Sequence, residues 1–263
     1  MIIEFLLTIL VVGIVTAGLN IKFDRFFTIL LLLFIFGLTI FDAVNIFLWV
    51  ILLGALIILI QNRKIISGLP KSMKIKLFVL VPILTLVASF AGSYLFSVST
   101  QSILIIVLGI LAILYGLRLI FIHFTPQELG LQKESPIVAK ICGIFGPIIS
   151  GFFVGLIGTS LKPLKIPFAI KIGKMNIKQV YLGNVITAFF ASLFAIIWHF
   201  FLNPNITFNI FYKQFLFGAI LWIGIHYTSK FVSIFFKDKW KKLFQIFIGI
   251  ILLLASIKIF MLI

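Results

Sequence analysis

Five residues in one short stretch have the side chains and the backbone freedom to bind a small ligand. The stretch reads GLIGTSLKPLKIPF. The second glycine of the stretch lets the backbone approach a ligand, the two hydroxyls donate hydrogen bonds, and the two lysine ammonium groups supply positive charge. A helix beginning just beyond would point its positive end into the same space. These groups suit an anion, and we expect one to contact Gly158, Thr159, Ser160, Lys162 and Lys165.

The chain around this stretch is poorly suited to a continuous helix. Residues 143–167 hold five of the 19 glycines and three of the eight prolines. Such a density interrupts a helix and leaves backbone groups that neighbours, water or a ligand must satisfy. We expect Gly151 and Gly155 to serve helix packing. A lysine at membrane depth is usually functional, whereas one that reaches the headgroups is merely interfacial, and both interpretations are open for Lys162 and Lys165.

Other polar residues lie at the starts of long apolar segments. Asn45 in DAVNIF and Asn184 with Thr187 in YLGNVIT each follow a short apolar segment. They either contact the same anion or hydrogen-bond between helices. Asn20, in GLNIKFDR, is a further candidate, although Asp24 can pair with the cations beside it and leave an ordinary interfacial loop.

The histidines offer a second kind of chemistry. His226, in LWIGIHYTS, either carries a coupling proton or hydrogen-bonds a neighbouring helix. His199 follows Trp198 at a helix end, and we expect it at the membrane interface, like Trp49 and Trp240.

The sequence does not indicate an enzyme. A single cysteine excludes an internal disulfide and a cysteine-based metal cage. The sequence has no zinc-protease, nucleophile-elbow or P-loop motif. We therefore expect no catalytic residue, no metal and no cofactor.

The composition indicates that these residues lie in a membrane. Of 263 residues, 63% are hydrophobic and 11% are charged, and the mean hydropathy is +1.32. Soluble domains are about 45–50% apolar. The formal net charge is +16. In membrane proteins an excess of Lys and Arg usually lies in cytoplasmic loops that face anionic lipids, so we expect the positive charge to contact lipid and not nucleic acid. We expect a multi-pass protein of the cytoplasmic membrane, with its oligomeric state left open.

Ten apolar segments follow when the chain is divided at charges and turn residues. A helix needs about 20 residues to span a bilayer, and the second and seventh segments are too short. Short segments at matching places in two halves mark the binding site of many transporters. The segments are approximately 2–21, 26–40, 43–60, 77–96, 102–122, 141–159, 164–173, 179–202, 213–234 and 243–263.

The ten segments form a repeat of five. Gly18 matches Gly155 at an offset of 137 residues, and Gly109 matches Gly249 at 140. Because five is odd, the second copy should be inverted in the membrane. The predicted fold is therefore an all-α polytopic membrane protein with two inverted repeats and 8–10 membrane segments, some short or re-entrant. Its parts are residues 1–125, a connecting loop at 126–140, and residues 141–263.

Loop charges agree with the inversion. The loop QNRKIISGLPKSMKIK carries five basic residues and no acid, whereas its counterpart FLNPNITFNIFYK carries one lysine. The positive-inside rule places the first in the cytoplasm and the second outside, and both termini outside. The acid-free lysines between 162 and 178 favour a hairpin in which the sixth and seventh segments enter from the cytoplasm and return.

The order of several motifs resembles the TauE/SafE-type sulfite exporters. The motifs are SGFFVGLIGTS, IPFAIKIG and QVYLGNVITAFF in the second half, and LLFIFGLTIFDAVNIFLWVILL, ASFAGSYL and LGILAILYGLRLI in the first. The resemblance implies secondary transport of small sulfur-containing anions, such as sulfite or organosulfonates. Family members carry adjacent glycines in each half, where this chain has GTSL and GLNI, so hydroxyls and lysines are expected to replace part of a backbone cradle.

Two other functions are weighed against anion transport by alternating access. A channel or carrier for another cargo, such as a metal cation, predicts clustered carboxylates, and only Asp42 lies near a segment end. A membrane partner subunit that transports nothing predicts that residues 158–165 tolerate substitution.

Overall fold

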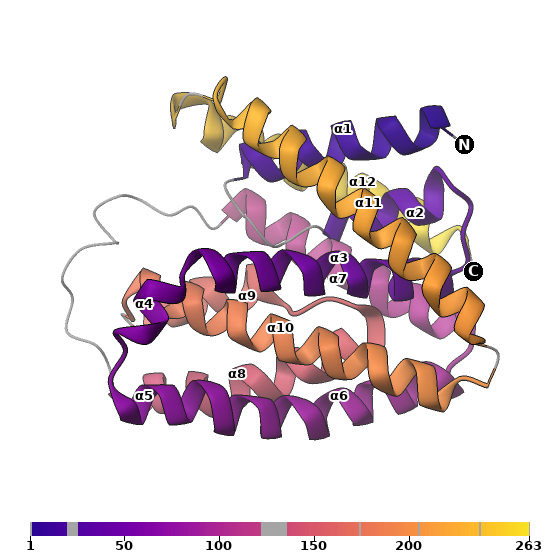
Figure 1. Ribbon diagram of the computed structural model, residues 1–263. Helices are drawn as coiled ribbons and strands as arrows, with labels where there is room; N and C mark the ends of the chain where they lie inside the picture. Colours follow the sequence, from indigo (N-terminus) through magenta and orange to yellow (C-terminus); the bar gives the residue numbers. More distant parts are fainter. Residues whose placement is uncertain are drawn as a thin grey trace. The chain divides into compact units, whose positions relative to one another are not determined.

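The computed structural model describes residues 2–19, 26–121, 136–173, 175–204, 206–236 and 238–262. These residues form helices joined by short turns, without a strand among them (Figure 1). The expected all-α fold is confirmed. The helices are α1 (Ile2–Gly18), α2 (Phe26–Phe34), α3 (Ile40–Gln61), α4 (Arg63–Ser67), α5 (Lys71–Ile75), η1 (Lys76–Leu80), α6 (Val81–Val98), α7 (Gln101–Phe121), α8 (Pro136–Ile157), α9 (Lys162–Pro167), η3 (Phe168–Ile172), α10 (Ile177–Leu202), α11 (Phe208–Ser233) and α12 (Asp238–Phe260).

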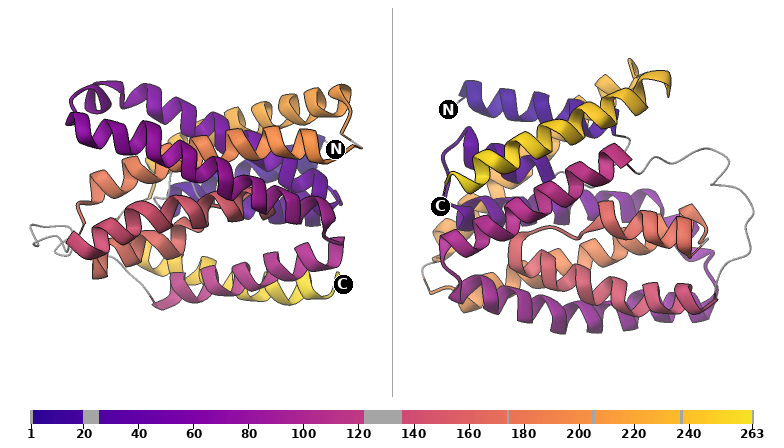
Figure 2. Two further views of the ribbon diagram at one scale, coloured as in Figure 1. Left: turned by 90° about the horizontal axis from the view of Figure 1, so that it is seen from below. Right: turned by 180° about the vertical axis from the view of Figure 1, so that it is seen from behind.

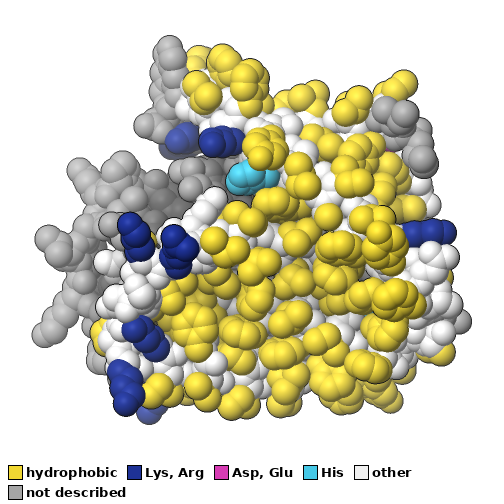
Figure 3. All heavy atoms as spheres, in the orientation of Figure 1, with side chains coloured by type: hydrophobic (Ala, Val, Ile, Leu, Met, Phe, Trp, Pro, Cys, Tyr) yellow, Lys and Arg dark blue, Asp and Glu magenta, His cyan; other side chains and the backbone are white. Residues whose placement is uncertain are grey.

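Seven helices among the described residues are long and apolar enough to cross a membrane. Hydrophobic side chains dominate their exposed surface (Figure 3), as expected where lipid is the solvent. The chain is therefore a multi-pass membrane protein. The seven helices are Ile40–Gln61, Lys71–Val98, Gln101–Phe121, Lys140–Ile157, Gln179–Leu202, Phe208–Ser233 and Trp240–Phe260.

The remaining predicted segments are short. α1 has 17 residues and α2 has nine. Beyond α8, α9 and η3 together cover residues 162–172, about half of a 30 Å span at 1.5 Å per residue.

One predicted loop is largely helical. The basic stretch after α3 forms α4, and a second helix begins after Pro70 and continues through the π-helical turn η1 into α6. The fixed φ of proline suits the position just before a helix, and no further glycine or proline follows until Pro82. The basic side chains therefore project from helical turns.

The helices group into two compact units. The first unit contains Met1–Val50, Ser99–His123 and Ile206–Ile263, and the second contains Ile51–Val98 and Phe124–Asn205. Each unit takes segments from both predicted halves. The division into residues 1–125 and 141–263 describes a sequence repeat, and it stays a prediction.

In the first unit, α11 lies beside α1 and α3. Gly224 faces Ile9 and Gly13 faces Thr228, so residue numbers rise together and α1 runs parallel to α11. The same holds for α3, where Gln214 donates a 3.2 Å hydrogen bond to Asp42 and Gly218 lies against the carbonyl of Ile46.

Also in the first unit, α7 packs on α12 with almost no side chain between the backbones. A Cβ on Gly116 would lie 2.8 Å from the carbonyl oxygen of Gly249, and a Cβ on Gly249 would lie equally close to that of Gly116. Gly109 faces Phe260. Residue numbers therefore run in opposite directions, and the two helices are antiparallel.

In the second unit, α6 packs parallel to α8 through small residues. Gly92 has the carbonyl of Phe152 where a side chain would be, and Gly155 has the carbonyl of Ser89. Gly151 faces Thr85 one turn earlier. These contacts confirm that Gly151 and Gly155 serve helix packing, as small residues in membrane helices commonly do.

α10 also runs along α6 in the same direction. Val81 packs with Leu182 and Ile186 near one end, and Phe96 stacks on His199 near the other. Because α8 and α10 both run parallel to α6, the chain between Ile157 and Ile177 must return to the level at which α8 began. Figures 1 and 2 show this return, in which the chain turns back alongside α8 before α9 begins.

The close approach of α6 and α8 makes a stability prediction. We expect Gly92→Ala to lower the thermal unfolding midpoint in detergent by several degrees. The added methyl group would overlap backbone atoms of α8, which cannot move aside as a flexible side chain could. Gly143→Ala is the matched control. Outside the neighbouring turns of α8, no described atom lies within 4 Å of a Cβ at Gly143, and alanine is the better helix former by about 1 kcal/mol. Equal midpoints for the two variants would contradict the packing described here.

Candidate functional site

The candidate site is the interruption between α8 and α9. α8 ends at Ile157, and the next residue, Gly158, has a φ of +74°. Leu161 has a φ of +51° and is the one non-glycine residue with positive φ among the described residues. This conformation costs an L-residue about 1–2 kcal/mol, and the burial of the Leu161 side chain helps to hold it. The predicted helix interruption is confirmed, but it is confined to residues 158–161, because Pro147 lies inside α8.

A lysine ties the short helix back to α8. The ammonium group of Lys165 donates hydrogen bonds to the hydroxyl of Ser150 and to the carbonyl of Gly146, the second at 3.3 Å. Ser150 in turn donates to the carbonyl of Ser160 at 3.2 Å. Ser150 thus joins α8, the interruption and α9 in one network.

The interruption is buried and electropositive. Thr159, Ser160 and Lys162 are 3%, 8% and 4% exposed. Both described partners of Lys165 are neutral, and the sequence of the second unit has no Asp or Glu within its described residues. A concentration of one sign of charge without counter-charge attracts ligands of the opposite sign. The electrostatics therefore suit an anion.

Two predicted site residues lie on α10 of the same unit. The side-chain amide of Asn184 donates to the carbonyl of Val180, and the hydroxyl of Thr187 donates to that of Gly183, both at 2.8 Å. Val180 packs with Ala169 and Ile170 of η3, and residues four apart share a helix face. Asn184 therefore lies on the face of α10 directed toward η3. This bond uses one of the two amide hydrogens of Asn184, whereas Thr187 has used its one hydroxyl hydrogen.

A sequence comparison decides the family. The family model for the sulfite exporter TauE/SafE matches residues 5–259. The chain belongs to this family. No curated protein and no solved structure matches the chain. The match covers both predicted halves and the interruption, which confirms the resemblance, and a TauE/SafE protein is a membrane transporter.

Three other predicted site residues of this TauE/SafE chain are not among the described residues of the second unit. Asn20 is outside the described residues. Asn45 is buried in α3, and His226 is half-buried on α11 with its ring stacked on Trp222 at a centroid distance of 5.2 Å. Asn45 and His226 belong to the first unit. Their roles stay predictions.

The side chain of His199, expected at the membrane interface, faces other helices, and its depth in the membrane stays a prediction. The side chain is 2% exposed, its Nε2 lies 2.6 Å from the carbonyl oxygen of Gly155, and its ring stacks on Phe96. An adjacent tryptophan is typical of the membrane interface, but His199 lies on the face of α10 that packs against α6 and α8.

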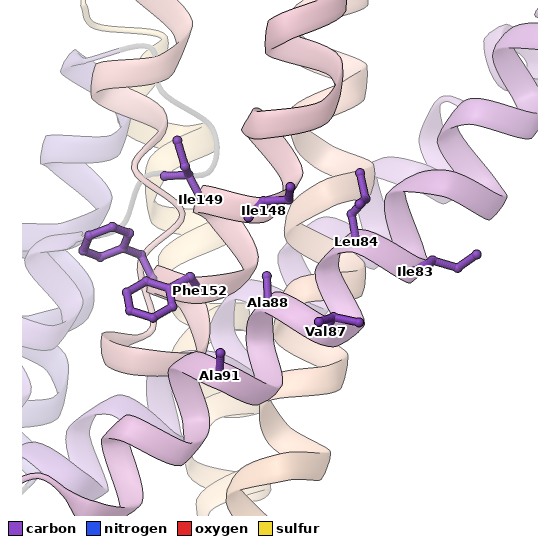
Figure 4. A pocket seen from close by; sticks show the side chains of 9 residues that line it. Ile83, Leu84, Val87, Ala88, Ala91, Ile148, Ile149 and Phe152 are labelled. Atoms are coloured by element: carbon purple, nitrogen blue, oxygen red, sulfur yellow. The ribbon is translucent and has the colours of Figure 1, made fainter.

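A second feature of the same unit is an apolar pocket. A pocket of about 490 Å³ between α6 and α8 is lined entirely by apolar side chains, among them Val87, Ile148 and Phe152 (Figure 4). It offers an anion no donor. The described residues also contain no group of three His, Cys, Asp or Glu side chains able to hold a metal.

Sequence reasoning missed Ser150 and His199. The signal for Ser150 was present, because it is a lone hydroxyl in the apolar middle of α8. No sequence signal separates His199 from an interfacial histidine.

The network around Lys165 makes a second prediction. We expect Lys165→Met and Ser150→Ala each to lower the free energy of unfolding. The loss in the double variant should be smaller than the sum of the two single losses, by about 1–3 kcal/mol. The reason is that the Lys165 ammonium donates to the Ser150 hydroxyl. Denaturant unfolding of the four proteins in a mixed micelle measures the coupling. Strictly additive effects would mean that the two side chains do not interact.

Proposed function

We propose that this TauE/SafE protein moves small anions, sulfite and organosulfonates among them, across the cytoplasmic membrane by alternating access. The observation that carries the proposal is the interruption at residues 158–161. There Lys162 and Lys165 lie beside strained backbone and two buried hydroxyls, in a unit whose described residues lack carboxylates.

The proposed binding step exchanges the partners of Lys165. In the described state its ammonium group is held by a hydroxyl and a carbonyl. An anionic sulfonate or sulfite oxygen attracts an ammonium group more strongly than a neutral hydroxyl or carbonyl oxygen does, so it competes well for the same ammonium group. Thr159 and Ser160 would contact the remaining oxygens, and Gly158 would let them approach the backbone.

The other candidate residues keep supporting roles in this proposal. Asn184 would donate to the anion from α10, and Thr187 would donate to it only after its hydroxyl leaves the carbonyl of Gly183. Asn20 and Asn45 are the candidates from the first half. His226 would carry the proton if transport is proton-coupled.

Helix directions support an inverted repeat. An inverted second copy requires the first segment of each half to run parallel to the fourth of the other half. α1 is parallel to α11 in the first unit, and α8 is parallel to α6 in the second. The final segments of the halves, α7 and α12, are antiparallel, as inversion also requires. A direct repeat would reverse all three relations.

A topology prediction follows from the inverted arrangement. In a Cys142→Ala background we expect Lys71→Cys and Lys242→Cys to react with thiol reagents from the cytoplasm, and Thr100→Cys and Pro204→Cys from outside. All four positions are exposed, and the basic stretches should face the cytoplasm. Membrane-impermeant reagents applied to oriented vesicles make the assignment. Labelling of residues 71 and 242 from opposite sides would rule out inversion.

A transport prediction tests the site. Purified protein in liposomes should take up sulfite and methanesulfonate at mildly alkaline pH, where little neutral sulfur dioxide leaks through the bilayer. We expect Lys165→Gln to lower uptake at subsaturating substrate about 10-fold, because a charge-assisted hydrogen bond is lost. Lys140→Gln, which removes an exposed charge from the same helix, should behave like the parent.

The uptake results separate transport from site assignment. Sulfate and chloride serve as competing anions, and an imposed pH gradient tests proton coupling. If no anion enters under any of these conditions, the transport proposal is wrong. Equal uptake by the parent and Lys165→Gln would contradict the site alone.

A further inference from the structure

His199 satisfies a backbone group that the interruption of α8 leaves open. The last carbonyls of a helix have no partner within it. The carbonyl of Val154 accepts the amide of Gly158 at 2.9 Å. The next carbonyl, that of Gly155, would accept the amide of Thr159, but the chain leaves the helix at Gly158. Nε2 of His199 lies 2.6 Å from this oxygen. A carbonyl has no proton to give, so Nε2 is the donor.

The Gly155 peptide is fixed from a second side as well. A Cβ at Gly155 would overlap the carbonyl of Ser89 on α6, so that helix lies directly against the backbone. Phe96, also on α6, is fully buried, and its ring lies parallel to that of His199 within 5° at a centroid distance of 4.1 Å. The stack orients the imidazole toward α8. Three helices therefore meet at one peptide, one turn before the interruption.

We propose that His199 is a positioning residue that caps α8 from α10 and so holds residues 158–161 in their binding conformation. This inference rests on the proposed function, since it concerns the same site. An unpartnered buried carbonyl is unfavourable. A neutral imidazole supplies the missing donor without adding a charge beside Lys162 and Lys165.

The bond also has a consequence for movement. It joins the C-terminal end of α10 to the end of α8, while the start of α10 packs on η3 through Val180. α10 thus contacts the hairpin both before and after the interruption. The interruption and α10 should move as one body during transport.

The first test asks whether the donor holds the interruption. In a Cys142→Ala background, Ser160→Cys replaces a buried hydroxyl and reports opening through its rate of reaction with a small thiol reagent. His199→Phe keeps a ring on Phe96 but removes the donor. His199→Gln keeps a donor with a reach similar to that of Nε2. We expect labelling about 10-fold faster in His199→Phe, from the loss of a buried hydrogen bond, and within about 2-fold of the parent in His199→Gln.

The second test uses transport of sulfite by the same His199 variants without the reporter cysteine. We expect His199→Phe to raise the KM for uptake about 10-fold with little change in maximal rate, and His199→Gln to restore the parent value. A role in packing alone would not be rescued by glutamine.

Three outcomes would overturn the inference. Parent-like labelling in His199→Phe would show that the bond does not hold the interruption, and equal labelling in the Phe and Gln variants would show that the donor is irrelevant. If His199→Phe does not fold, His199→Asn replaces it, because asparagine is one bond shorter and should label faster than His199→Gln. Equal labelling rates for His199→Asn and His199→Gln would be the third outcome that overturns the inference. Labelling needs no substrate, so failure of transport in the parent would overturn the proposed function without deciding this test.

Discussion

The need to satisfy backbone polar groups away from water governs this structure. A buried helix end leaves carbonyl and amide groups that apolar neighbours cannot bind. At the end of α8 the described partners come from the surrounding chain: Gly158 for Val154, His199 for Gly155, and Ser150 for Ser160. The glycine contacts between α6 and α8 place the backbone of α6 directly against Gly155. The interruption is therefore stabilised by hydrogen bonds from residues of the second unit itself.

The same region concentrates positive charge with neutral partners. A structural ion pair would neutralise Lys165, but Ser150 and Gly146 do not. The absence of carboxylates from the described sequence of the second unit means that its basic residues remain a net positive field. That field attracts anions into an otherwise apolar environment and repels cations. It therefore agrees better with the proposed anion transport than with a metal carrier.

Segment lengths, the two short segments and the place of the interruption were predictable from sequence, because they depend on local composition. Apolar runs of about 20 residues predict spans, and Gly158 marks the point where α8 ends. The pairing of Ser150 with Lys165 and the inward direction of His199 were not predictable. Both depend on which helix faces which, and α10 brings His199 to α8 from 44 residues away along the chain. The helical form of the basic stretch after α3 was missed because a cluster of charges between apolar segments is typical of a loop. Most of its residues are nevertheless compatible with a helix.

The interruption combines one fixed end with one exchangeable end. At Gly155, α6 leaves no space on one side and His199 holds the carbonyl on another, so displacement would break a buried hydrogen bond and a tight backbone contact together. At Gly146, the carbonyl accepts a hydrogen bond from Lys165, whose side chain is long and flexible. A ligand can therefore draw the Lys165 ammonium group away without displacing backbone, whereas the helix end keeps its place. Such an arrangement would let Lys165 respond to the proposed anion while the backbone of the proposed site stays ordered.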